Sequence, residues 1–145
     1  MSEHILAIDP GHETGWARGM ILNDRLTVTG HGWTPWKEFV MALYNTKEEY
    51  DTIVYESWRL RAAEARSLIG SDLQSSQAIG AIKLVAWTRG IKLVTQEPSD
   101  KSTANRWIAA AGITLPKSDV EHNRDALRHL YYYYFNQIGG PHEHA

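Results

Sequence analysis

Two acidic residues stand where buried strands are expected to end. The apolar run Ile5–Ile8 leads into Asp9, and the β-branched run of residues 51–55 leads into Glu56. Taken singly, Asp9 reads as a turn former within Asp-Pro-Gly, and Glu56 reads as an ordinary charge at a strand end. Open α/β sheets, however, bind ligands at the carboxyl ends of their strands. A carboxylate that leaves a hydrophobic strand also needs a cation or hydrogen-bond donors, so both residues are candidates for a site.

A third set of ionisable residues lies on a helix predicted over residues 119–138. His122, Asp125 and His129 are spaced by three and four residues, so they share one helical face. A roughly opposite stripe is expected to be buried, and it consists of Leu127, Leu130, Tyr131 and Tyr134. Taken alone, the polar face reads as a solvated surface with acidic residues near the helix start, where they are favoured.

The three acidic elements together point to metal chemistry. Oxygen ligands from two strand ends and a facing helix suit Mg²⁺ or Mn²⁺. Two such ions held close together can activate a water molecule and stabilise the leaving oxygen of a phosphodiester. In such a site one carboxylate bridges both ions and each of the others holds one. The pattern therefore suits metal-dependent cleavage of a phosphodiester.

The elements that must position these residues alternate between strands and helices. The predicted strands are residues 5–8, a hairpin over residues 20–33 that turns at Asn23-Asp24, and residues 51–56 and 91–94. One predicted helix begins at residue 34, and three others span residues 73–87, 99–111 and 119–138. Thr34 is expected to cap the first helix with Pro35 in its first position, and Ser99 or Asp100 to cap the third. This order predicts an α/β fold with helices on both faces of the sheet.

The 145 residues suit one domain, which we expect to span residues 1–138, with residues 139–145 as a flexible tail. The absence of cysteine excludes disulfides, thiolate zinc sites and cysteine nucleophiles. The formal net charge is -2, with acids prevailing in residues 1–56 and bases in residues 57–106. A basic middle permits a polyanionic partner, although a pI near 6.4 is low for a nucleic-acid binder.

No apolar run approaches the roughly 20 residues that cross a bilayer, and the first four residues lack the basic region of a signal peptide. We therefore expect a cytoplasmic protein with no membrane partner. His142 and His144 are expected to face solvent in the tail.

Five short motifs follow one another along nearly the whole chain. They are the run Ile5–Trp16, the strand Ile53–Glu56, the run Ser76–Gly80, the run Gln96–Pro98 followed by Lys101, and His122 three residues before Asp125-Ala126. In this order they resemble the RuvC-type Holliday junction resolvases of the RNase H-like superfamily. The compact chain looks most like phage-encoded members, which would act in a bacterial or phage-infected cell. The resemblance implies a mixed sheet whose first strands are antiparallel and whose later strands are parallel.

The resemblance also implies metal-site roles for the matching residues. Asp9 would bridge two Mg²⁺ or Mn²⁺ ions, Glu56 would hold one and Asp125 the other, and His122 would be a ligand or a proton-handling partner. Three further residues, His12, Glu13 and His129, stay open as additional members of the site.

For DNA, the resemblance implies that Lys101 contacts phosphate and that Trp58 stacks on an unpaired base. A core or rim position is equally open for Trp58. The DNA backbone would be followed by Arg59, Arg61 and Arg66. A homodimer through the helix Leu73–Trp87, with Ser76 and Gly80 permitting close approach, would cut a four-way junction by paired symmetric nicks that leave 5′-phosphate and 3′-hydroxyl ends.

Departures from the family pattern leave other functions open. The opening loop is one residue shorter, and residues 102–106 stand where a glycine-rich, lysine-bearing segment is expected. These differences favour, as an alternative, a nuclease for flaps, forks or single strands. The run Asp9–Gly15 also resembles the phosphate loop of actin-like phosphotransferases. Those enzymes need two lobes around the nucleotide, however, and 145 residues supply only one. A catalytically inactive junction-binding protein is the remaining alternative.

Overall fold

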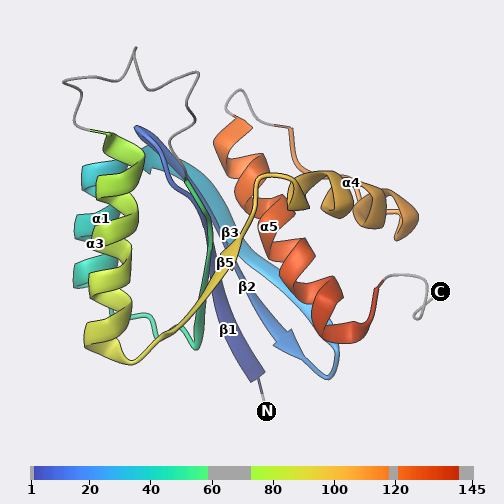
Figure 1. Ribbon diagram of the computed structural model, residues 1–145. Coiled ribbons are helices and arrows are strands. Elements are labelled where there is room, and N and C mark those ends of the chain that lie inside the picture. The colour runs from blue at the N-terminus through green and yellow to red at the C-terminus, as the bar shows by residue number, and fades with distance from the viewer. Residues whose placement is uncertain (1, 59–72, 118–120, 141–145) are drawn as a thin grey trace.

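The computed structural model describes residues 2–58, 73–117 and 121–140. One five-stranded sheet runs through it in the order β3-β2-β1-β4-β5 (Figure 1). The strands are β1 Ser2–Asp9, β2 Glu13–Leu22, β3 Arg25–Pro35, β4 Thr52–Glu56 and β5 Lys92–Gln96. β2 pairs antiparallel with both β1 and β3, whereas β4 pairs parallel with both β1 and β5. This mixed sheet confirms the predicted fold class.

Helices cover both faces of the sheet, as the sequence predicted. α1 (Trp36–Asn45) and α3 (Gln74–Arg89) lie on one face, while α5 (Glu121–Ile138) crosses the other with α4 (Asp100–Ala110) against it (Figure 1). Side chains alternate along each strand, so Leu6 and Ile8 of β1 pack under α1 and α3, whereas Ile5 and Ala7 pack under α5. No helix in the described part of the chain is long and apolar enough to span a membrane.

The helix starts differ from the sequence prediction. Thr34 and Pro35 belong to β3, where Pro35 still pairs with Glu13, and Pro35 is the N-cap of α1 without a side-chain cap. Ser99 occupies the N-cap position of α4 but makes no capping hydrogen bond, and Asp100 Oδ2 instead accepts from the Glu97 backbone N–H. In α1 the strand pairing competes for the residues that the local pattern assigned to the cap.

The buried face of α5 is also broader than predicted. Leu127 and Leu130 are buried, but Tyr133 and Phe135 are buried in place of Tyr131 and Tyr134. Two surfaces cover this helix: Tyr133 packs on the sheet side, and Phe135 joins the cluster between α4 and α5. The predicted stripe assumed that α5 packs against one surface only, and it therefore named the wrong tyrosines as buried. Of the predicted tail, residues 141–145 lie outside the described residues.

Candidate active site

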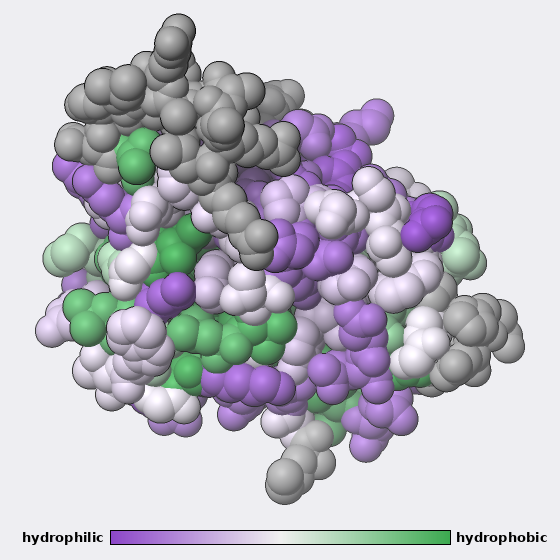
Figure 2. All heavy atoms as spheres, in the orientation of Figure 1, coloured by the Kyte–Doolittle hydropathy of each residue, from purple (hydrophilic) through white to green (hydrophobic). Residues whose placement is uncertain are grey.

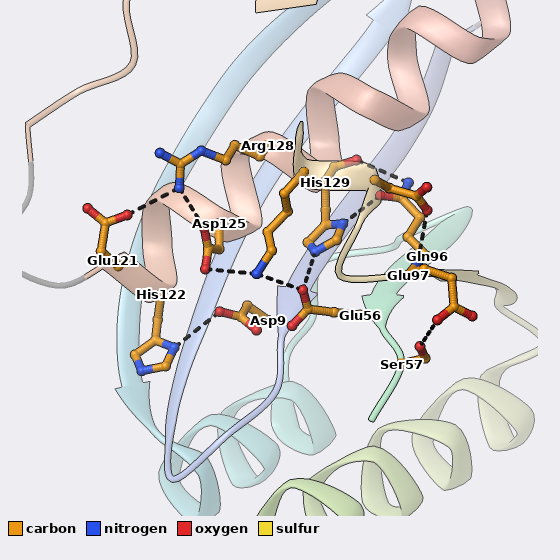
Figure 3. A network of polar contacts seen from close by, with 12 residues as sticks. Asp9, Glu56, Ser57, Gln96, Glu97, Glu121, His122, Asp125, Arg128 and His129 are labelled. Carbon is orange, nitrogen blue, oxygen red and sulfur yellow. Dashed lines mark hydrogen bonds and ion pairs between the residues drawn. The ribbon is translucent and has the colours of Figure 1, made fainter. Parts of the chain in front are cut away.

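The strand register brings three polar residues to one edge of the sheet. The β1–β4 ladder ends one residue before Asp9 and Glu56, which therefore lie side by side. β4 and β5 pair with Glu56 opposite Gln96. Because side chains alternate along a strand, all three point to the face that α5 covers. The parallel pairing thus delivers both predicted carboxylates to the start of α5 (Figure 3).

The first turns of α5 supply the facing residues. His122 Nδ1 lies 3.1 Å from Asp9 Oδ2, and Asp125 follows one turn later on the same side (Figure 3). A glycine in β2 makes this approach possible, because a Cβ atom at Gly15 would lie 1.9 Å from the backbone oxygen of His122. Gly15 therefore sets how closely the helix start sits over the strands.

A cationic side chain lies among the carboxylates. Lys101, in the first turn of α4, places its Nζ 2.8 Å from Glu56 Oε1 and 3.2 Å from Asp125 Oδ2. Arg128, one turn after Asp125 in α5, lies 2.5 Å from the other oxygen of Asp125. The family resemblance implies that Lys101 contacts a phosphate, which stays a prediction, and the sequence gave no role to Arg128. The helical spacing of three from Asp125 was the available signal.

His129 is buried, in contrast to the open helix face predicted for it. Its side chain has no exposed surface. Its ring Nδ1 lies 2.6 Å from Gln96 Oε1 and its Nε2 lies 3.2 Å from Glu56 Oε1. The sequence gave Gln96 no role, because its place beside Glu56 depends on the pairing of β4 with β5.

The electrostatics differ between the two strand-end carboxylates. Burial raises the pKa of Asp9 to about 6; the contact with His122 opposes the shift, and the neighbouring charges of Glu56 and Asp125 add to it. Burial also acts to raise the pKa of Glu56, but hydrogen bonds from His129 and Lys101 outweigh it and lower that pKa to about 2. The hydrogen bond to Asp9 raises the pKa of His122. Asp9 is therefore the carboxylate that most lacks a compensating cation.

The donor set suits a hard divalent cation by type and by charge. Among the described residues, no three His, Asp or Glu side chains already stand in an arrangement that holds a metal ion. The ammonium of Lys101 instead lies between Glu56 and Asp125, so these carboxylates already converge on a positive charge. Carboxylate oxygens are the ligands that Mg²⁺ and Mn²⁺ prefer. The residues therefore fit such an ion, provided that Lys101 turns away.

The other residues singled out from the sequence lie around this site or outside the described chain. Trp58 is half-buried, two residues beyond Glu56, and its contact with a base stays a prediction. His12 Nδ1 pairs with Gln74 Oε1 at 2.6 Å, at the start of α3. Glu13 is half-buried in β2. Outside the described residues lie Arg59, Arg61 and Arg66.

The sequence matches no protein-family model and no curated protein. Its fold is similar to that of Thermus thermophilus RuvC in complex with a Holliday junction substrate, with a TM-score of 0.68 at 14% identity over 96% of this chain and 97% of that one. A second RuvC structure from that organism gives 0.67 at 16% identity, with the same coverage. The yeast mitochondrial Holliday junction resolvase Ydc2 gives 0.52 at 14% identity over 94% of this chain and 69% of that one. The chain therefore has a RuvC-like fold.

Proposed function

We propose that the protein is a divalent-metal-dependent endonuclease that resolves four-way DNA junctions by paired nicks. The observation that carries this proposal is that Asp9 and Glu56, at the carboxyl ends of two strands, lie beside Asp125 of α5, with the ammonium of Lys101 between Glu56 and Asp125. The fold resembles that of the RuvC protein solved with a junction substrate, which supports DNA as the substrate. Such an enzyme would act in the cytoplasm of a bacterial or phage-infected cell.

In this proposal each residue of the site has its own role at the scissile phosphate. Asp9 would bridge two Mg²⁺ or Mn²⁺ ions, with Glu56 and Asp125 holding one each. When bound, the ions would supply an activated water and stabilise the leaving oxygen. His122, hydrogen-bonded to Asp9, would hold or pass on a proton at Nδ1. Lys101, displaced from the carboxylates by the ions, would be free to contact a phosphate oxygen.

Two copies of the chain would cut the two strands of a junction. The outer side of α3 exposes Leu84 and Trp87, at 62% and 67%, in line with the small residues Ser76 and Gly80. A Cβ atom at Gly80 would meet no atom within 4 Å, so the surface is open there. Figure 2 shows hydrophobic residues gathered on the side where α3 lies. A two-fold axis that passes beside this helix would pair it with the same helix of a second copy. The apolar residues would then be buried, and the axis would relate two active sites.

A cleavage assay on defined DNA substrates tests the proposal. The substrates are a labelled four-way junction, a flap, a single strand and a linear duplex, each with about 10 mM Mg²⁺ or Mn²⁺, where weak oxygen-ligand sites fill. The wild-type protein is compared with Asp125→Asn and with Glu49→Gln. Glu49→Gln removes one carboxylate from the exposed loop before β4, at the end of that strand remote from Glu56, and serves as the matched charge control.

Paired symmetric nicks in the junction with the wild type and Glu49→Gln, but not with Asp125→Asn, are the expected result. Cleavage of flaps or single strands alone would support a nuclease but contradict junction resolution. The departure from the family pattern at residues 102–106 would then explain the change of substrate. Tight junction binding without cleavage in either metal would identify a binding protein instead.

A further inference from the structure

His129 and Gln96 form a buried pair directly behind Glu56. They are 0% and 4% exposed and come from α5 and β5, two elements that meet at this edge of the sheet. The proposed chemistry assigns nothing to either residue. A fully buried imidazole carries two polar nitrogens that need partners, so both of its contacts are informative about its role.

The hydrogen bonds fix the orientation of both side chains. Gln96 Nε2 donates to the backbone carbonyl of His129 at 3.2 Å, and a carbonyl can only accept. The amide oxygen of Gln96 must therefore face the ring, where Nδ1–H of His129 donates to it at 2.6 Å. Flipping the ring or the amide would leave a buried polar group without a partner, which costs about 1–3 kcal/mol. Gln96 thus holds the imidazole in one orientation.

The held ring presents its other nitrogen to Glu56. His129 Nε2 lies 3.2 Å from Glu56 Oε1, within hydrogen-bonding distance. Lys101 contacts the same oxygen at 2.8 Å. When Lys101 turns away, His129 stays as a fixed partner of Glu56 Oε1. The second oxygen of Glu56 lies on the side of Asp9 (Figure 3).

We propose that His129, oriented by Gln96, is a positioning residue that keeps Glu56 turned toward Asp9 for binding a divalent cation. This rests on the proposed function, in which Glu56 holds a metal ion. A carboxylate ligand held by an outer hydrogen bond pays less entropy on binding the ion. Loss of such an outer partner typically lowers metal affinity or activity by about 10–100-fold.

Two substitutions of His129 differ only in which ring nitrogen they replace. In His129→Gln the side-chain amide reaches the position of Nε2 and can still donate to Glu56. In His129→Asn the amide reaches only the position of Nδ1, so it keeps Gln96 and loses Glu56. Gln96→Met removes the group that orients the ring. Each variant is measured for Mn²⁺ binding by electron paramagnetic resonance without DNA, for the Mg²⁺ concentration giving half-maximal junction cleavage, and for metal-free melting temperature.

We expect His129→Asn to weaken Mn²⁺ binding and raise the half-maximal Mg²⁺ concentration by about 10–100-fold, with Gln96→Met in the same direction and His129→Gln restoring most of the loss. Unchanged metal binding in His129→Asn would overturn the proposal. Equal losses in the Asn and Gln variants, in step with melting temperature, would overturn it too, since they would indicate a structural role alone.

The two proposals fail separately. Suppose that the wild type binds Mn²⁺ and that His129→Asn binds it more weakly than His129→Gln does, but that no junction is cleaved. This result would contradict junction resolution and support the positioning role. A wild type that cleaves junctions while His129→Asn retains wild-type Mg²⁺ dependence would remove only the positioning role. A wild type that binds no Mn²⁺ would overturn the positioning role outright.

Discussion

The two faces of the sheet use the same strands for opposite purposes. On the α5 face, Asp9 and Glu56 end two strands beside Asp125 of α5. The chain itself supplies the partners of these three carboxylates, which are His122, Lys101 and Arg128. On the other face, α1 and α3 bury a largely apolar layer, while the outer side of α3 leaves Leu84 and Trp87 exposed. These carboxylates therefore have partners within one chain, whereas Leu84 and Trp87 would be covered only in the dimer that we propose. In the proposed enzyme, the sheet would lie between the active site and the dimer contact.

Closing the space under α5 should have the largest effect. Gly15→Ala would place a methyl group 1.9 Å from the backbone oxygen of His122, so the start of α5 must move. We expect a loss of about 3 kcal/mol or more in the free energy of unfolding and at least a 100-fold loss of junction cleavage. Thermal unfolding and cleavage rates measure both. Wild-type stability and cleavage in this variant would show that α5 does not need its close approach to β2.

Placing charge on the open face of α3 should act on assembly without acting on the fold. Leu84→Glu changes a side chain that is 62% exposed, so we expect little change in the stability of one chain. In a dimer the same carboxylate would be buried without a partner, and we expect dimer dissociation to become at least about 100-fold easier. Analytical ultracentrifugation of both proteins over a dilution series measures this. Identical masses at every concentration would place the dimer contact elsewhere.

Removing the charge of Asp9 should separate stability from activity. Its folded pKa, near 6, lies above the usual 3.8, so the folded state favours the protonated carboxyl and stability falls as pH rises from about 4 to 6. Without metal, the free energy of unfolding of Asp9→Asn should therefore exceed that of the wild type by about 1–3 kcal/mol above pH 6. Most of this difference should be gone by pH 4, which is close to the usual pKa of 3.8. Junction cleavage should be abolished.

The measurement is the melting temperature at pH 4 and pH 7.5 with and without Mg²⁺. Added Mg²⁺ should raise the wild-type value and leave that of Asp9→Asn unchanged. A variant less stable than the wild type at pH 7.5 would mean that the Asp9 charge is already compensated in the metal-free protein.

The smallest expected effect sharpens the contrast with Gly15. Gly80→Ala introduces the same methyl group into α3, where no atom lies within 4 Å. The higher helix propensity of alanine should stabilise a single chain by about 0.5–1 kcal/mol. If two copies approach closely there, the dimer should weaken while the single chain gains. Denaturant unfolding of a dilute sample and sedimentation of a concentrated one distinguish the two effects.

Local pattern was sufficient for most elements and for the first carboxylates. The runs before Asp9 and Glu56 identified both strands, and helical spacing placed His122 and Asp125 on one face, since each of these signals is contained in a few neighbouring residues. The prediction was wrong about the start of α1 and about which tyrosines of α5 are buried, because neither depends on neighbouring residues alone. Pairing with β2 and packing of α4 are contacts between distant segments, and they override local preference.

The sequence by itself determined which residue types stand at the strand ends and on the facing helix, because alternation and helical periodicity are local properties of the chain. Only the tertiary structure decided that Lys101 lies between Glu56 and Asp125, and that His129 is buried against Gln96. Both depend on the register of β4 with β5 and on the packing of α4 against α5. Those arrangements minimise the free energy of the whole chain, so no short stretch of residues encodes them.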